Sequence, residues 1–232
     1  MKKLLLIITL ILPLLLSSES WAIEYDDLMK REGLYYEKFT DIPFTGKVDD
    51  QPKLSFKDGK ISGEYVSYYE NGQLSYKLNY VNDEKHGEYF GYYENGQLYF
   101  KYNYVNDEPH GEYFGYYENG QLKLKVNYVN GELHGELVSY YENGQLSYKL
   151  NYVNGELHGE GVSYHENGRL FFIENYVNDK KHGEYVDYYE DVNGETFHRG
   201  NYVNGKRHGE WVTYYPPGQL NSIVNYVNGV PQ

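Results

Sequence analysis

Residues 63–86 read Gly63-Glu-Tyr-Val-Ser-Tyr-Tyr-Glu-Asn-Gly-Gln-Leu-Ser-Tyr-Lys-Leu-Asn-Tyr-Val-Asn-Asp-Glu-Lys-His86, and the same pattern returns along most of the chain. The opening glycine recurs every 24 residues, and the last one follows after 26. These glycines are Gly63, Gly87, Gly111, Gly135, Gly159, Gly183 and Gly209. Self-similarity at a fixed period is typical of repeat architectures. We therefore number positions within each unit from its opening glycine.

Each unit predicts one β-hairpin, because aromatic and β-branched residues dominate it and turn-forming residues occur at two places in it. The first turn falls at Asn71-Gly72 and the second at Asn82-Asp83 in this unit. Strands lie about 4.8 Å apart, so each hairpin advances a sheet by about 9.6 Å. Seven such units predict an all-β fold, an elongated single-layer antiparallel sheet about 67 Å long.

Two registers fit this hairpin. A two-residue turn at Asn-Gly places positions 1, 3, 5 and 7 on one face with 12, 14, 16 and 18. That face carries no charge in the first unit, whereas the opposite face mixes Glu64, Tyr68, Lys77 and Asn79. A three-residue turn, Glu-Asn-Gly with a left-handed glycine, instead swaps the faces of the first strand. Pro216-Pro217-Gly218 replaces Glu-Asn-Gly in the last unit and cannot form the two-residue turn, because proline cannot adopt a positive φ.

The two-residue register also predicts charge pairs between units, in which the lysine at position 15 faces the glutamate at position 2 of the next unit. These pairs are Lys77–Glu88, Lys101–Glu112, Lys125–Glu136 and Lys149–Glu160. The unit from Gly183 has two extra residues within 191–194, and an even insertion keeps side chains on their own faces. Small residues at position 5, such as Gly91, leave room for neighbouring rings. Pro231 lies where an exposed sheet edge needs blocking.

The N-terminal 22 residues predict a cleaved secretory signal peptide. Lys2 and Lys3 precede a thirteen-residue apolar stretch, and Ser20-Trp21-Ala22 places small residues where a signal peptidase cuts. The remaining segment, residues 23–62, predicts an N-terminal cap with a degenerate repeat from Phe44 to Ser62, and a short helix within Glu24–Glu32. Residues 63–232 form the seven repeats. We expect an exported protein of the periplasm or the extracellular space.

Composition excludes several classes of protein. The 232 residues include 31 tyrosines and no cysteine, which rules out disulfides, thiolate metal sites, a cysteine nucleophile and a lipidated N-terminal cysteine. The formal net charge of −13 argues against nucleic-acid binding, which needs a basic face. It also weakens any attraction to anionic lipid.

No residue pattern predicts an enzyme, a metal or a cofactor. Six histidines precede opening glycines: His86, His110, His134, His158, His182 and His208. Neighbours about 9.6 Å apart cannot share one Zn²⁺, which holds its ligands at about 2 Å. His165 and His198 are single departures from the repeat. A calcium site at Asp187, Glu190, Asp191 and Glu195 is conceivable, but the spacing matches no EF-hand loop.

The tyrosine at position 6 is the candidate binding residue, because an exposed tyrosine beside Glu, Gln and Asn makes a good recognition surface. The row comprises Tyr68, Tyr92, Tyr116, Tyr140, Tyr164, Tyr188 and Tyr214. Regularly spaced tyrosines would grip an extended protein segment or a linear glycan. The tyrosines of the charge-free face are interpreted as structural.

The pattern His-Gly-Glu-Tyr/Trp-x-x-Tyr-Tyr-Glu-Asn-Gly-Gln-Leu, followed by Asn-Tyr-x-Asn-Gly, resembles the bacterial variant of the MORN (membrane occupation and recognition nexus) repeat. The segment from Gly209 to Tyr215 is the most similar copy. Arg31-x-Gly33-Leu34-x-Tyr36 and residues 43–46 resemble the lead-in segment of YwqK-family antitoxins. The resemblance covers about residues 28–232. It implies protein or membrane binding, and the antitoxin label implies neutralisation of a partner by contact.

Together, these features predict a non-enzymatic exported repeat protein that binds another protein as a scaffold or inhibitor. The alternatives are a module for cell-wall glycan or a membrane surface, and an antitoxin-like neutralising protein. A hydrolase using the irregular unit around His198 is a further hypothesis.

Overall fold

The computed structural model describes residues 23–190 and 195–232, so the predicted signal peptide at 1–22 lies outside the described residues. The cap contains a short 3-10 helix and five strands: η1 (Tyr25–Asp27), β1 (Leu28–Arg31), β2 (Leu34–Glu37), β3 (Gly46–Val48), β4 (Leu54–Lys57) and β5 (Lys60–Ile61). The repeat strands of the first four units are β6 (Gly63–Tyr68), β7 (Leu74–Val81), β8 (Glu84–Lys85), β9 (Gly87–Tyr92), β10 (Leu98–Val105), β11 (Glu108–Tyr116), β12 (Leu122–Val129), β13 (Glu132–Leu133), β14 (Gly135–Tyr140), β15 (Leu146–Val153) and β16 (Glu156–Leu157). Those of the last three are β17 (Gly159–Tyr164), β18 (Leu170–Val177), β19 (Lys180–Lys181), β20 (Gly183–Tyr188), β21 (Thr196–Val203), β22 (Lys206–Tyr215), β23 (Gln219–Val227) and β24 (Val230–Pro231).

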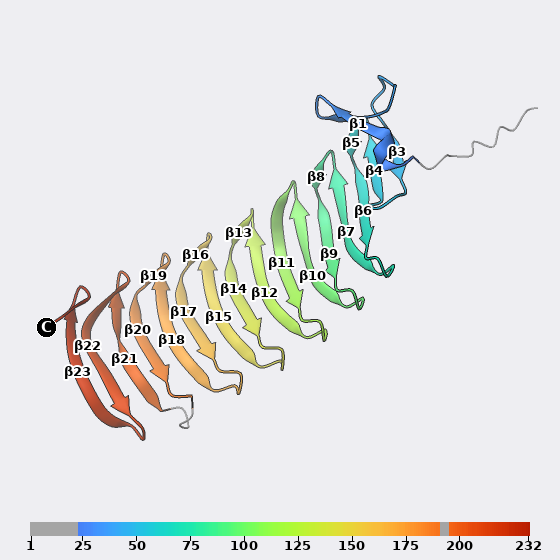
Figure 1. Ribbon diagram of the computed structural model, residues 1–232. Helices are drawn as coiled ribbons and strands as arrows, with labels where there is room; N and C mark the ends of the chain where they lie inside the picture. Colours follow the sequence, from blue (N-terminus) through green and yellow to red (C-terminus); the bar gives the residue numbers. More distant parts are fainter. Residues whose placement is uncertain (1–22, 191–194) are drawn as a thin grey trace, which may run out of the picture.

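The repeats form one long antiparallel sheet in which strands follow one another in chain order (Figure 1). The sheet is a single curved layer, with the cap at one end and the C-terminus at the other (Figure 1). This confirms the predicted all-β, elongated fold of tandem hairpins. Within residues 23–190 and 195–232, no helix has the length and apolar character needed to cross a bilayer.

In the hairpins whose internal turn is fully described, this turn has three residues; the turn of the sixth unit includes residues 191–194, which lie outside the described residues. In the first unit the N–H of Tyr69 donates to the carbonyl of Gln73 at 2.8 Å, and the N–H of Gly72 donates to the carbonyl of Tyr69 at 2.9 Å. Gly72 has a φ of 84°, which glycine adopts without strain. Pro216-Pro217-Gly218 takes the same place in the last unit, between Tyr215 and Gln219. The two-residue turn is therefore wrong, and the three-residue alternative describes the loop.

The predicted swap of faces does not follow from this turn, because a β-bulge on the second strand compensates for the extra residue. Ser67 pairs with Tyr76 but Tyr68 pairs with Leu74, so Ser75 is unmatched. Beyond the bulge, Tyr65 pairs with Leu78 and Gly63 with Tyr80, as in the two-residue register. Two features of that register are wrong: Leu74 faces Tyr68 and not Tyr69, and Ser75 turns to the charge-free face, where its Oγ lies 2.7 Å from the Oγ of Ser67.

The turn between units is a two-residue turn, as predicted. Asn82 and Asp83 have φ of 53° and 72°, the geometry of a type I′ turn, and Val81 pairs with Glu84 across it. The opening glycine then forms a second bulge, at Gly87 with a φ of 85°. This bulge shifts the register, so Lys77 pairs with Phe90 at position 4 of the next unit.

That shift makes the predicted pairs Lys77–Glu88, Lys101–Glu112, Lys125–Glu136 and Lys149–Glu160 wrong. The lysine at position 15 pairs with position 4 of its own unit on one side and with position 4 of the next unit on the other. Its side chain reaches diagonally to the position-2 glutamate of its own unit. Three such pairs each have an Nζ–Oε1 distance of 2.6 Å: Lys77–Glu64, Lys125–Glu112 and Lys149–Glu136.

Side chains at two turn positions tie neighbouring units together. The hydroxyl of Tyr69, at position 7, donates to the carbonyl of Tyr92 at 2.6 Å, and the same bond recurs at Tyr93, Tyr117, Tyr141 and Tyr189. Asn71, at position 9, accepts from the N–H of Gln73 and donates to the carbonyl of Glu94 at 3.0 Å. Each unit is thus fixed to the next by side chains as well as by the strand ladder.

The sheet therefore has two chemically different faces. The aromatic face carries positions 3, 5, 14, 16 and 18, and its rings contact one another from unit to unit. The centroid of Tyr89 lies 6.1 Å from that of Tyr76 in the preceding unit, and the centroid of Tyr102 lies 5.4 Å from that of Tyr113 in the following unit. A Cβ on Gly91 would lie 2.5 Å from Phe100, so the predicted need for a small residue there is confirmed. The mixed face carries positions 2, 4, 6, 15 and 17. The extra residues before Thr196 leave this register intact, since Glu184 pairs with Asn201 as Glu64 pairs with Asn79.

The cap holds a small hydrophobic core made of Leu28, Phe44, Val48, Leu54 and Phe56. Residues 28–31 pair with β2 and bury Leu28, so the helix expected over Glu24–Glu32 is wrong beyond the single turn of η1. The N–H of Val66 donates to the carbonyl of Lys53 at 3.0 Å, which covers the free edge of β6. At the other end, β24 returns over β23, and Pro231 pairs with Tyr226.

Candidate functional site

The position-6 tyrosines lie in one row on the mixed face, one to each unit. Tyr68 is 36% exposed, and the other six are partly buried. Tyr68, Tyr92, Tyr116, Tyr140, Tyr164, Tyr188 and Tyr214 all pair with position 12 of their own hairpin or its equivalent. The structure therefore arranges these residues in a line along the ribbon and does not bring them together at one point.

Glutamate at position 2 and lysine at position 15 lie beside the tyrosine row. In the Lys77–Glu64 pair the side chains are 46% and 56% exposed. The hydrogen bond and charge of Glu64 raise the pKa of Lys77, and Glu112 does the same for Lys125. Pairs this exposed contribute little to the stability of the fold, because solvent screens their attraction. Their larger effect is to neutralise the mixed face in the N-terminal units.

The last three units differ, because isoleucine or arginine replaces the lysine at position 15. The replacements are Ile173, Arg199 and Ile223, which lie diagonally across their own hairpins from the position-2 glutamates Glu160, Glu184 and Glu210. In the part of the chain that the structure describes, none of these three carboxylates forms an ion pair. The guanidinium of Arg199 lies 5.9 Å from the ring centroid of Tyr214 instead.

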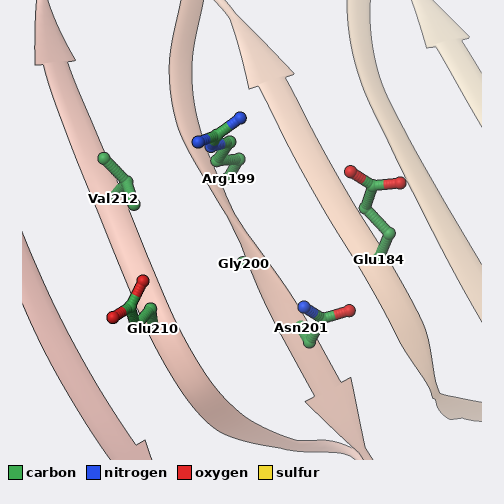
Figure 2. Close-up of a pocket in the computed structure, with 6 residues that line it drawn as sticks. All are labelled: Glu184, Arg199, Gly200, Asn201, Glu210 and Val212. Carbon is green, nitrogen blue, oxygen red and sulfur yellow. The ribbon is translucent and has the colours of Figure 1, made fainter.

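Shallow hollows lie on the mixed face at equivalent unit positions. One of about 170 Å³ is lined by Glu88, Phe90, Lys101, Asn103 and Glu112, among others. A larger one of about 410 Å³ is lined by Glu184, Arg199, Gly200, Asn201, Glu210 and Val212 (Figure 2). Figure 2 shows the two carboxylates and the guanidinium standing on three strands, β20, β21 and β22. Each hollow is a basin with an apolar side chain at position 4 and charges at its rim.

In units five and six the aromatic face carries acidic and histidine side chains among its rings. Glu174 is 5% exposed; its Oε2 lies 2.5 Å from the Nζ of Lys181, and its Oε1 accepts a hydrogen bond from Tyr176. Burial, then the bond to Glu174, raises the pKa of Tyr176. The Nδ1 of His198 lies 3.0 Å from the Oδ2 of Asp187, which also accepts from Tyr185 at 3.2 Å. These groups satisfy one another inside the sheet.

The histidines do not gather. The six that precede opening glycines are exposed along the turn edge, and His86 donates its N–H to the carbonyl of Asn79 at 2.9 Å. His165 takes the place of the position-7 tyrosine, and the centroid of its ring lies 4.6 Å from that of Phe171. Among the described residues, no three His, Asp or Glu side chains group as a metal site would require. Asp191, from the conceivable calcium set, lies outside the described residues.

Comparison with known families accounts for the repeat. The sequence model of the MORN repeat variant matches six segments: residues 56–82, 85–106, 109–130, 133–154, 157–178 and 207–228. The chain belongs to the MORN repeat variant family. The unmatched stretch contains the MORN unit with the two extra residues. Its hairpin nevertheless keeps the register of the others. No curated protein matches the chain.

Sequence reasoning found the tyrosine row but missed the loss of lysine in the last three MORN units. The signal was present in the sequence, since Ile173 and Ile223 stand where four earlier units have lysine. It was missed because the predicted register paired each lysine with the wrong glutamate.

Proposed function

We propose that this MORN-repeat protein is a non-enzymatic exported scaffold or inhibitor that holds a protein partner on its mixed face. The observation that supports this most is the tyrosine row, which repeats once per unit beside charged and amide side chains. Tyrosine offers a large apolar contact area with a polar tip, and such residues dominate the energetics of protein interfaces. A single-layer sheet of seven units presents this surface over its whole length.

The arrangement of polar groups favours binding over bond-breaking. On the aromatic face, Asp187 bonds to His198 and accepts a hydrogen bond from the hydroxyl of Tyr185, and no serine or threonine hydroxyl among the described residues bonds to His198. The basins of the mixed face are open and lined by carboxylates that repeat in every unit. A tuned acid–base pair would need different environments for its two groups.

The test is capture of a stoichiometric partner from envelope proteins by the immobilised mature chain. Replacing Tyr116, Tyr140 and Tyr164 with Ala should abolish capture, because it removes three adjacent rings of the row. The matched control replaces Val105, Val129 and Val153 with Ser. These valines are 39–40% exposed and recur at position 19, away from the row. Thermal unfolding verifies that both variants are folded.

Two outcomes would contradict the proposal: no stoichiometric partner for the wild-type chain, or equal loss of capture in both variants. Sedimentation with peptidoglycan and with liposomes tests the glycan and membrane-surface alternatives. Binding there that depends on the same three tyrosines, with no protein partner, would replace the protein partner by that polymer or surface. An antitoxin-like role would appear as loss of the partner's toxicity upon capture.

A further inference from the structure

The mixed face changes its charge along the ribbon. In the first four units each position-2 glutamate shares its hairpin with a lysine at position 15, and three of these pairs are in contact at 2.6 Å. In the last three units Glu160, Glu184 and Glu210 share the face with one cation, Arg199. This end therefore carries an excess of two negative charges on a face that is otherwise balanced.

The larger basin lies at the same end. Glu184 and Glu210 stand on opposite sides of it, with Arg199 and Asn201 between them and Val212 on the same strand as Glu210 (Figure 2). Tyr188 and Tyr214 of the tyrosine row belong to the same two hairpins. Carboxylates beside partly exposed aromatic rings attract a cationic side chain both by charge and by cation–π contact.

The spacing of the units restricts the backbone that such cations come from. Adjacent hairpins are about 9.6 Å apart. Three residues of polyproline II span about 9.3 Å and return to the same side of the helix, so every third side chain meets the next unit with an error of about 0.3 Å. In a β-strand every third side chain points to the opposite face, so it cannot meet successive units. Seven residues of an α-helix rise about 10.5 Å, so its side chains fall out of step with the spacing of the units, about 9.6 Å, sooner than those of polyproline II.

We propose that the mixed face over β17 to β23 binds a protein segment in the polyproline II conformation that carries Lys or Arg at every third residue. Successive cations lie against Glu160, Glu184 and Glu210, and the prolines between them lie along the tyrosine row. This inference rests on the proposed function, because it names the chemistry of the partner segment. The N-terminal units bind this segment less well, since their glutamates already hold lysines.

The experiment uses two dye-labelled peptides of identical composition and measures binding by fluorescence anisotropy at about 0.15 M salt. In the first, (Pro-Pro-Lys)₄, lysine occupies every third residue; in the second, eight prolines precede four lysines. The mature chain should bind the spaced peptide at least about tenfold more tightly than the block peptide. Failure to bind the spaced peptide, or equal binding of both, would overturn the proposal.

Two sets of variants locate the site. Replacing Glu160, Glu184 and Glu210 with Gln should weaken binding of the spaced peptide about tenfold. The matched control, Glu118→Gln with Glu142→Gln and Glu166→Gln, makes the same change in net charge at the same spacing on the turn edge and should leave binding unchanged. Equal weakening by both sets would show non-specific attraction and refute the site.

A third variant restores the pattern of the N-terminal units. Ile173→Lys with Ile223→Lys places a lysine beside Glu160 and Glu210, and should weaken binding as much as the glutamine set. Unchanged binding in this variant would contradict the assignment. If the wild-type chain captures its partner through the tyrosine row and yet ignores the spaced peptide, this inference fails while the proposed function stands.

Discussion

At the scale of single residues, the repeat is maintained by side chains that bond to the next unit. The Oδ1 of Asn71 accepts a hydrogen bond from the N–H of Gln73, which stabilises the turn that contains Asn71. Its Nδ2 donates a hydrogen bond to the carbonyl of Glu94 in the next unit. An amide suits both bonds, because its oxygen accepts while its nitrogen donates. The tyrosine at position 7 acts similarly, since its hydroxyl donates to the backbone carbonyl of a tyrosine of the position-6 row in the next unit. The row is thus positioned by the preceding unit.

Tyr117→Phe tests this link, because it removes the hydroxyl that donates to the carbonyl of Tyr140 at 2.8 Å. We expect the free energy of unfolding to fall by about 1 kcal/mol, as measured by urea denaturation. Tyr215→Phe is the control: it occupies the same position in the last unit, where no further unit follows within the described chain, and it should cost less than about 0.5 kcal/mol. Equal effects of the two changes would refute a role for the inter-unit bond.

Gly91→Ala tests the close approach on the aromatic face. The added Cβ would lie 2.5 Å from the ring of Phe100, which neighbouring rings hold in place. Overpacking of this kind destabilises by about 1–3 kcal/mol. At the equivalent Gly115 the nearest atom is the hydroxyl of Tyr113 at 3.1 Å, the end of a side chain that can move. Gly115→Ala should therefore lower the unfolding midpoint less, and the reverse order would contradict this packing argument.

At the scale of elements, the sequence predicts the strands, the type I′ turns between units and the alternation of the two faces, but it leaves the turn inside the hairpin open between two and three residues and does not predict the bulges. Alternation with period two is preserved because Ser75 compensates for the three-residue turn, and this compensation leaves no mark in the pattern of polar and apolar residues. The bulge at Gly87 shifts the pairing by an even number of residues, so each side chain stays on its face and the sequence pattern does not reveal this shift either. The excess charge of Glu160 and Glu210 was readable from Ile173 and Ile223, once each glutamate is assigned to its own hairpin.

Alkaline pH should loosen the aromatic face. Burial, followed by the charges of neighbouring tyrosines, raises the pKa of Tyr89 to about 12, and burial also raises the pKa of Tyr102 and Tyr185. Tyrosine in the unfolded chain ionises near pH 10. Because the folded pKa lies above the unfolded value, this stabilisation is complete below about pH 10 and is lost as pH rises towards 12. The urea midpoint should fall across that range.

Tyr89→Phe provides the control for this pH dependence. The substitution keeps the ring and removes one ionisable hydroxyl, so the fall in urea midpoint between about pH 10 and 12 should be shallower than in the wild type. An unchanged slope would show that the aromatic face is not the origin of the effect.

At the scale of the whole molecule, stability is distributed along a line. Each unit contacts its neighbours, so the fold behaves as a sum of units and junctions. The ends are treated differently: the cap covers the edge of β6 through Lys53 and Val66, whereas β24 covers the C-terminal part of β23. The molecule therefore gains length and binding surface together, one hairpin at a time.

Deleting one complete MORN unit tests this organisation. Removing residues 111–134 joins His110 to Gly135, so every position keeps its equivalent and the hydroxyl of Tyr93 meets the carbonyl of Tyr140 in place of that of Tyr116. We expect a folded chain whose long dimension in small-angle scattering is shorter by about 9.6 Å. Removing only residues 111–122 joins His110 to Lys123 and loses the glycine bulge and one strand of the hairpin. That half-unit deletion should destroy cooperative unfolding, because the second strand of the hairpin then takes the place of the first, without the turn and the paired positions that set its register. A folded half-unit variant, or an unfolded whole-unit one, would show that the 24-residue hairpin is not the unit of this fold.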